Sequence, residues 1–157
     1  KTLAELEEAG KLTAVITQNI DGLHQMAGSK NVLELHGSIH RNYCMKCGAF
    51  YDMAYVKHAD GVPKCEKCGG VIKPDVVLYE EGLDSDVISG AVNAIRNADM
   101  LIIGGTSLVV YPAAGLVNYY KGSKLVLINK SRTSMDSQAD LAINEPIGEV
   151  FSQIIVR

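Results

Sequence analysis

The four cysteines of the chain occur as two closely spaced pairs. Cys44 and Cys47 form one Cys-x2-Cys motif, and Cys65 and Cys68 form a second after 17 intervening residues. The x2 spacing lets two thiolates converge on one ion, and two such pairs supply the four ligands of a tetrahedral zinc site. Disulfides, a redox pair and an iron–sulfur cluster are the alternatives, and the spacing favours zinc over them. Because four cysteines leave no open position, the predicted zinc is structural and not catalytic.

Polar side chains that could bind a ligand follow an apolar, β-branched run at residues 13–17. Gln18, Asn19, Ile20 and Asp21 come directly after this predicted strand. In α/β proteins, ligand-binding groups gather where strands end, at the carboxyl edge of the sheet. The amide of Asn19 and the carboxylate of Asp21 could bind a ribose or an amide. They could equally cap the short helix that follows, and the residues alone do not decide between the two roles.

His36 is the strongest candidate for a catalytic residue among the four histidines. It follows a short apolar run at 32–35 and precedes a glycine, so its side chain can be exposed at a sheet edge. An imidazole gains and loses a proton near neutral pH, which suits general acid–base catalysis. We expect His24, His40 and His58 to be structural or exposed, because none of them ends a strand in polar company.

Two other strand ends carry groups that could meet a cofactor. Gly105, Thr106 and Ser107 follow the fully apolar run at 100–103, which is typical of a parallel strand covered on both faces. Their backbone N–H groups and hydroxyls could approach a phosphate. The turn lacks the G-x-G-x-x-G spacing, so it does not identify a cofactor site by itself. Asn129 ends the next predicted strand, where it could bind a ribose or simply terminate the strand.

Apolar runs of strand length alternate with amphipathic segments of helix length along most of the chain. Asp84 or Ser85 is expected to cap a helix that reaches Ile95, and Pro112 and Pro146 are expected to open two further helices. The predicted strands cover 13–17, 32–35, 76–79, 100–103, 124–129 and 141–143. This alternation predicts an α/β fold with a doubly wound parallel sheet.

Residues 41–73 differ from the rest of the chain. They hold both cysteine motifs and a Tyr-rich segment, and they have little apolar core of their own. We therefore predict a small inserted zinc-binding module at 41–73. Residues 1–40 and 74–157 are predicted to form one α/β domain around it.

Composition limits the class of function. The chain has 157 residues and a formal net charge of -3, which argues against a general nucleic-acid-binding protein. No apolar run approaches the roughly 20 residues that span a bilayer, so we expect no membrane partner. Paired cysteines suited to a metal favour a reducing compartment, and we expect a cytoplasmic location.

Six motifs, taken together and in this order, resemble the sirtuin family of NAD-dependent protein-lysine deacylases. They span nearly the whole chain: Thr17–Asp21, Leu35–Ser38, the two cysteine motifs, Pro74–Val77, Gly105–Pro112 and Ile128–Asn129. The resemblance implies a Rossmann-like fold that binds NAD and carries a zinc-ribbon module.

The resemblance also implies roles for individual residues. His36 would be the general base. One loop would line the nicotinamide-ribose end of the NAD site. Residues from several other loops would line its phosphate and adenosine end. These residues are Gln18, Asn19, Ile20 and Asp21 for the first loop, and Gly105, Thr106, Ser107, Asn129, Lys130 and Ile147 for the rest.

The implied substrate is an acyl-lysine peptide or protein. Val76 and Val77 would pair with its extended backbone, and Leu78 and Tyr79 would continue toward the acyl-lysine tunnel. The implied reaction removes the acyl group and releases nicotinamide and O-acyl-ADP-ribose. Mono-ADP-ribosyl transfer at the same site and a non-catalytic zinc-ribbon interaction module are the two alternative functions.

The chain departs from the family pattern at two places. Glu80 stands where the family has a glycine, so the backbone there is expected to differ. The Gly-Ala-Gly cofactor loop of the family does not occur in these residues, and chain position 1 is a lysine inside an amphipathic segment. We therefore expect a carboxyl-terminal portion of a sirtuin, with an incomplete parallel sheet and no turnover by itself.

Overall fold

Parallel strands form the α/β part of the chain. The computed structural model describes residues 1–156. In one sheet, β1 (Val15–Thr17) pairs with β2 (Val32–Glu34). A second sheet has the order β6-β7-β8, with bounds of Leu101–Gly104, Leu125–Ile128 and Leu141–Ile143. The two sheets do not pair with each other, which agrees with the incomplete Rossmann-like sheet predicted from the sequence.

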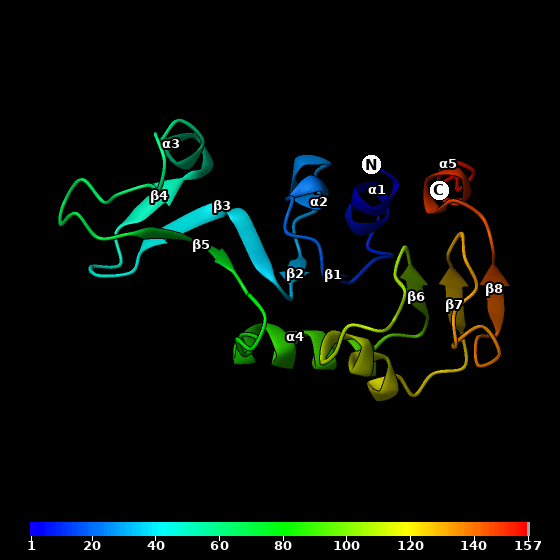
Figure 1. Ribbon diagram of the computed structural model, residues 1–157. Coiled ribbons are helices and arrows are strands. Elements are labelled where there is room, and N and C mark those ends of the chain that lie inside the picture. The colour runs from blue at the N-terminus through cyan, green and yellow to red at the C-terminus, as the bar shows by residue number, and fades with distance from the viewer. Residues whose placement is uncertain (157) are drawn as a thin grey trace.

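Helices lie on both sides of these strands (Figure 1). One side carries α1 (Thr2–Glu8), α2 (Leu23–Met26) and α5 (Ile147–Ser152), and the other carries α4 (Ser85–Arg96) and η1 (Ala113–Tyr119). The cap of α4 is Asp84, whose carboxylate accepts hydrogen bonds from the backbone N–H groups of Asp86 and Val87 at 2.8 and 3.0 Å. This confirms one of the two predicted caps.

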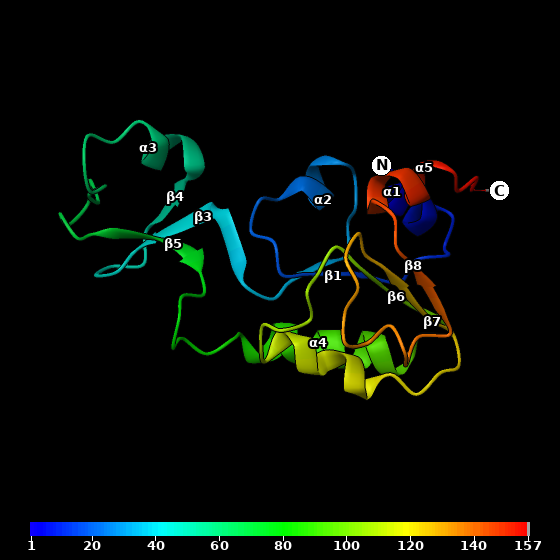
Figure 2. The same ribbon diagram turned by 45° about the vertical axis from the view of Figure 1, so that its right-hand side comes forward.

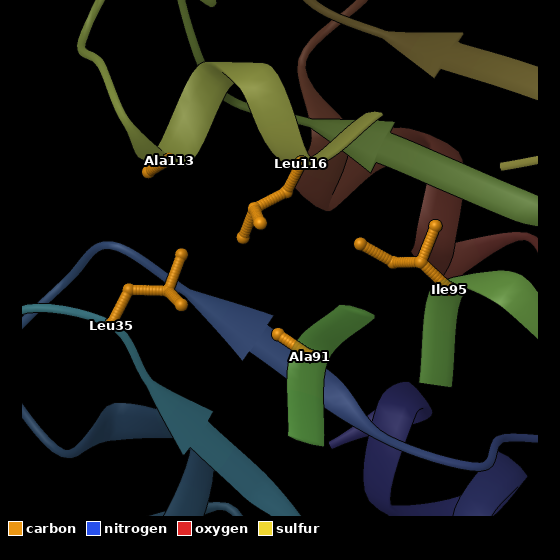
Figure 3. Close-up of a cluster of buried hydrophobic side chains, with 5 residues drawn as sticks. All are labelled: Leu35, Ala91, Ile95, Ala113 and Leu116. Carbon is orange, nitrogen blue, oxygen red and sulfur yellow. The ribbon is translucent and has the colours of Figure 1, made fainter. Parts of the chain in front are cut away.

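The main apolar core lies on the α4 side. Figure 3 shows Ala91 and Ile95 of α4 facing Leu35, which follows β2, and Leu116 of η1. Positions 91 and 95 are one helical turn apart and so share a face of α4. The core therefore fixes the segment that runs into His36 against a long, well-capped helix.

A three-stranded antiparallel sheet forms the cysteine-rich part, which stands at one end of the molecule (Figure 2). Its order is β4-β3-β5, and α3 (Met53–Lys57) packs beside it. The strands are β3 (Gly37–Cys44), β4 (Phe50–Asp52) and β5 (Ile72–Val76). Both β3 and β5 cross the predicted limits of the zinc-binding module, so the two regions are continuous through paired strands. The division into 41–73 and the remainder stays a prediction.

Two local expectations were wrong, and one predicted helix is present as a 3-10 helix. The strand predicted at 76–79 ends at Val76, because Glu81 N–H bonds to Leu78 C=O at 3.1 Å and closes a turn. The segment after Pro112 is a 3-10 helix, with a tight i to i+3 bond from Gly115 N–H to Pro112 C=O at 3.0 Å. Ile102 of β6 is 40% exposed, so this strand is not covered on both faces.

The described residues, 1–156, contain no helix that is long and apolar enough to cross a membrane.

Candidate functional site

The four cysteine sulfurs lie together at the end of the antiparallel sheet. All four are within 4.8 Å of one another, with 3.4 Å between the Sγ atoms of Cys44 and Cys68 and 3.6 Å between those of Cys47 and Cys65. Four sulfurs each about 2.3 Å from a central zinc lie roughly 3.8 Å apart in a tetrahedron. A disulfide needs about 2.05 Å. The donor set and its spacing therefore fit a structural zinc ion.

The two cysteine motifs fold into matching turns. The N–H of Gly48 bonds to the C=O of Cys44 at 2.9 Å, and the N–H of Gly69 bonds to the C=O of Cys65 at 2.8 Å. Both glycines have a left-handed backbone, with φ of 69° and 68°. A side chain is unfavourable in that conformation, which explains why each Cys-x2-Cys motif ends in glycine. The sequence repeat therefore becomes a structural repeat that presents two thiols on each turn.

Tyr51 supports the cysteine cluster and was missed in the sequence. Its hydroxyl donates to Cys65 Sγ at 3.2 Å and accepts from the backbone N–H of Glu66 at 2.9 Å. The bond to Cys65 raises the pKa of Tyr51 to about 12, and the same bond lowers the pKa of Cys65 to about 6. A donor that stabilises the thiolate favours metal binding. The available signal was a tyrosine at a strand position between the two motifs.

His36 lies between the polar loop after β1 and the end of β5. Its Nδ1 lies 2.9 Å from the backbone C=O of Gln18, and its own C=O accepts from Val77 N–H at 3.1 Å. A carbonyl can only accept a hydrogen bond, so Nδ1 carries the proton and Nε2 of the neutral ring keeps a lone pair. The half-buried imidazole is thus oriented as a base with one free nitrogen.

Gly37 explains how closely β3 approaches β5 beside this histidine. A Cβ atom at Gly37 would lie 1.9 Å from the backbone oxygen of Asp75, and its φ is 75°. Only glycine fits both constraints. The His-Gly pair therefore joins the candidate base directly to the strand that leads into Val76 and Val77.

Gln18 also connects the two parallel sheets. The hydroxyl of Thr106, after β6, donates to Gln18 Oε1 at 3.3 Å. Gly105, with φ of 63°, donates its N–H to Ile128 C=O at 3.1 Å. Two loops that are 88 residues apart in the chain therefore meet near His36.

Several predicted cofactor contacts also stabilise their own loops. Asp21 Oδ1 accepts from Leu23 N–H at 3.1 Å, and the amide of Asn129 donates to Ser131 C=O at 2.7 Å. Asn19 is exposed, and its backbone N–H donates to Thr17 Oγ1 at 3.1 Å. Asp21 thus forms a local turn bond to the first residue of α2 but does not cap this helix, whose N-cap is Gly22, and its second carboxylate oxygen stays available.

The remaining predicted residues lie near the ends of β1, β6 and β7. A Cβ atom at Gly104 would come within 2.2 Å of Ile147 Cδ1, so Ile147 packs directly on the end of β6. Ile20 is partly buried and accepts a backbone bond from Ile39 at 3.1 Å. Ser107 and Lys130 are exposed.

The predicted substrate segment forms an exposed turn after β5. Leu78 is 54% exposed and Tyr79 fully so, and Glu80 has φ of 70°. Glu80 therefore has a left-handed backbone that favours glycine, and its side chain is strained there. Glu81 Oε2 accepts from Leu78 N–H at 2.9 Å and from Lys73 Nζ at 3.1 Å, and these two bonds lower the pKa of Glu81.

His40 contacts the polar loop, which the sequence did not indicate. Its Nε2 lies 2.9 Å from the backbone C=O of Asp21, and its ring fills the space where a side chain at Gly22 would be. The available signal in the sequence was the glycine itself, which has φ of 69° in the structure.

Comparison with known proteins gives one consistent result. Residues 1–112 match the Sir2 family. The chain is 68% identical over 154 residues to an NAD-dependent protein deacetylase from Clostridium perfringens, covering 98% of this chain and 63% of that protein. It is 65% identical over 155 residues to an NAD-dependent protein deacetylase from Clostridium acetobutylicum, with 98% and 63% covered.

Solved structures agree with this result. The fold matches a Sir2–p53 peptide–NAD+ complex with a TM-score of 0.89 and 41% identity, over 97% of this chain and 65% of that one. It also matches Sir2 in complex with the inhibitor EX-527, 2'-O-acetyl-ADP-ribose and deacetylated p53 peptide, with a TM-score of 0.90 and 42% identity over 97% and 67%.

The chain belongs to the Sir2 family, the sirtuins. It spans less than two thirds of the length of the curated relatives described above.

Proposed function

We propose that this chain supplies the general base, the substrate strand and much of the NAD site of an NAD-dependent protein-lysine deacylase. The orientation of His36 carries the proposal. Its Nδ1 is held by the C=O of Gln18, and its own C=O accepts from Val77 N–H, so the residue is fixed between the polar loop and the substrate segment and Nε2 is left to act as the base. A base held on both sides has the fixed geometry that proton transfer requires.

His36 acts on a proton in this proposal. When bound, NAD would supply the ribose that takes up the acyl group; nicotinamide would leave the ribose, and water would release the free lysine. Nε2 of His36 accepts a proton from a ribose hydroxyl, and the Gln18 C=O stabilises the imidazolium because it accepts from Nδ1. General-base catalysis of this kind contributes about 10²–10⁴-fold.

Residues from both parallel sheets form the proposed NAD site. Gln18, Asn19, Ile20 and Asp21 are placed toward the nicotinamide ribose. The loop after β6 is placed toward the phosphates, and the ends of β7 and α5 toward the adenosine; these contribute Gly105, Thr106, Ser107, Asn129, Lys130 and Ile147. The 3.3 Å bond between Gln18 and Thr106 supports the proposal, because it brings the two groups of residues together.

The proposed substrate is an extended acyl-lysine segment beside β5. Val76 and Val77 would offer backbone groups to it, and Leu78 and Tyr79 would border the lysine side chain. The exposure of Leu78 and Tyr79, at 54% and 101%, leaves both side chains accessible to a bound peptide. Zinc on the four cysteines would hold β3 and β5 and take no part in bond making. The predicted cytoplasmic location follows from the reduced cysteines that such a site requires.

The 157 residues alone are proposed to be inactive. No Gly-Ala-Gly occurs in them, and the curated relatives are longer. The direct test is a chimera in which this chain replaces the matched 154 residues of the Clostridium perfringens relative. We expect nicotinamide release from NAD and an acetyl-lysine peptide by the chimera, and none by the 157-residue chain.

A matched pair of substitutions assigns the base. His36→Ala should reduce release by about 10²–10⁴-fold. His58→Ala is the control, because His58 also has Nδ1 on a backbone carbonyl, that of Ala54 at 2.7 Å, but is exposed in the zinc-binding region. A folded, zinc-loaded chimera without release would reject the proposal, and so would full activity of the His36→Ala variant.

A further inference from the structure

A bulge in β3 places Arg41 between two strands of the proposed active site. β3 pairs with β5 at Ser38 opposite Asp75 and again at Asn42 opposite Pro74. Between these two pairs β3 has three residues, 39–41, whereas β5 has no residue between Pro74 and Asp75. Bulges of this kind turn side chains away from the regular alternation of a strand.

The Arg41 side chain bonds to one residue shortly before His36 in the chain and to one shortly before Val76. Its Nη1 donates to Glu34 Oε2 at 2.7 Å, and its Nε donates to Asp75 Oδ2 at 2.8 Å. Glu34 is the last residue of β2 and stands two positions before His36. Asp75 stands one position before Val76. One guanidinium thus bonds a carboxylate beside each of the two proposed functional segments.

The bond to Glu34 is the stronger constraint because that carboxylate is buried. The Glu34 side chain is 8% exposed, against 44% for Asp75 and 40% for Arg41. Its other oxygen accepts from Gln25 Nε2 at 2.8 Å. A buried carboxylate that loses its cation is strongly destabilised, so the surrounding segment would rearrange. A lysine could not replace Arg41 fully, because it offers one point charge where two separate acceptors need donors.

We propose that Arg41 is a positioning residue that sets the substrate segment 76–79 relative to His36. It touches neither reacting group. It acts through Glu34 on the strand that leads to the base, and through Asp75 on the strand that leads to the substrate segment. The catalytic consequence of this role rests on the proposed function. The geometric role does not, because it depends only on contacts within this chain.

Amide exchange of the zinc-loaded 157-residue chain tests the geometric role without any activity. The reporter is Val77 N–H, which bonds to His36 C=O at 3.1 Å. Arg41→Met should speed its exchange by about tenfold, as expected for loss of a charge-assisted bond, and Arg41→Lys should have a smaller effect. Amides of the β6–β7 ladder should not change. Arg96→Met is the matched control, since Arg96 is exposed and its guanidinium lies 5.1 Å from the centre of the Tyr119 ring.

Kinetics of the chimera test the catalytic consequence. Arg41→Met should raise the KM for acetyl-lysine peptide by about tenfold and leave the KM for NAD unchanged. Unchanged exchange at Val77 overturns the positioning role, whatever the chimera does. Equal changes in both KM values also overturn it, because they indicate a general structural effect. An inactive parent chimera rejects the proposed function, and the exchange result still decides the geometry.

Discussion

The zinc-binding region and the α/β region of this chain are stabilised by different chemistry. In the first, two of the four buried core residues are the metal-ligating cysteines Cys44 and Cys65, packed with Tyr51 and Ile72. In the second, the five buried core residues are all aliphatic and lie between α4, η1 and the end of β2. The two regions share β3 and β5, so the candidate base lies where they join. Removal of the metal should therefore unfold the zinc-binding region as a whole. A single truncation in the aliphatic core should only lower the free energy of unfolding of the α/β region.

Loss of zinc should give the largest effect and would separate the two regions most clearly. Cys65→Ser removes one of four ligands, and structural zinc sites contribute about 10–16 kcal/mol of apparent binding free energy. We expect amide protection in β3, β4 and β5 to collapse while the β6–β7 ladder keeps its protection. Hydrogen exchange with and without a chelator measures both. Uniform loss of protection across the chain would contradict the comparison.

Leu116→Ala tests the aliphatic region. Leu116 is 6% exposed within the α4–η1 core (Figure 3), and truncating a buried leucine costs about 2–5 kcal/mol. Urea unfolding of the zinc-loaded chain should show this loss. Leu141→Ala is the control, because Leu141 is 51% exposed and should change stability little. Zinc affinity should stay the same in both variants, and a large loss of affinity would show that the regions are not separately stabilised.

Asp84→Ala sharpens the comparison within the α/β region. The carboxylate of Asp84 caps α4 through the N–H groups of Asp86 and Val87, and loss of such a cap costs about 0.5–2 kcal/mol. Asp84→Asn should keep most of the stability, because asparagine is an equally good cap. Thermal unfolding distinguishes the two. If both variants lost the same stability, the negative charge and not the cap would be responsible.

Glu7 should give the smallest effect, and it depends on pH. Its carboxylate accepts from the backbone N–H groups of Lys30 and Asn31 at 2.9 and 2.7 Å, and these bonds lower the pKa of Glu7 below its ordinary 4.5. The stabilisation is therefore present above the unfolded-state pKa and is lost as the pH falls through the lower folded-state pKa.

Glu7→Gln removes this pH-dependent contribution. We expect the Tm difference between the parent chain and the variant to be greatest at pH 6 and to shrink toward pH 3. Acid release of zinc affects both proteins, so it cancels in the difference. A Tm difference that does not depend on pH would contradict the account.

Local patterns predicted much of this molecule. The two Cys-x2-Cys motifs contain the whole geometry of their turns, because each motif and its glycine form a local unit. The cap at Asp84 and the short strand at 141–143 were also visible, since both depend on neighbouring residues. The ordered motifs indicated the family, and the matched residues 1–112 confirm it.

Contacts between distant segments could not be predicted in the same way. The early end of β5 depends on Glu81 reaching back to Leu78, and Tyr51 and His40 act on residues 14 and 19 positions away. No periodicity records such pairings. The left-handed backbone of Glu80 was hidden for another reason, because a glutamate occupies a position whose conformation favours glycine.

The identity of the acyl-bearing product distinguishes deacylation by this site from the alternative reactions. The chimera is incubated with NAD and a peptide whose acetyl-lysine carries an isotopic label in the acetyl group, and the products are identified by mass spectrometry. The proposed deacylase reaction predicts labelled O-acetyl-ADP-ribose in equal amount to nicotinamide, and formation of both products slowed by about 10²–10⁴-fold in the His36→Ala variant. Labelled free acetate without nicotinamide, or ADP-ribose attached to the peptide with the acetyl group still on lysine, would contradict it.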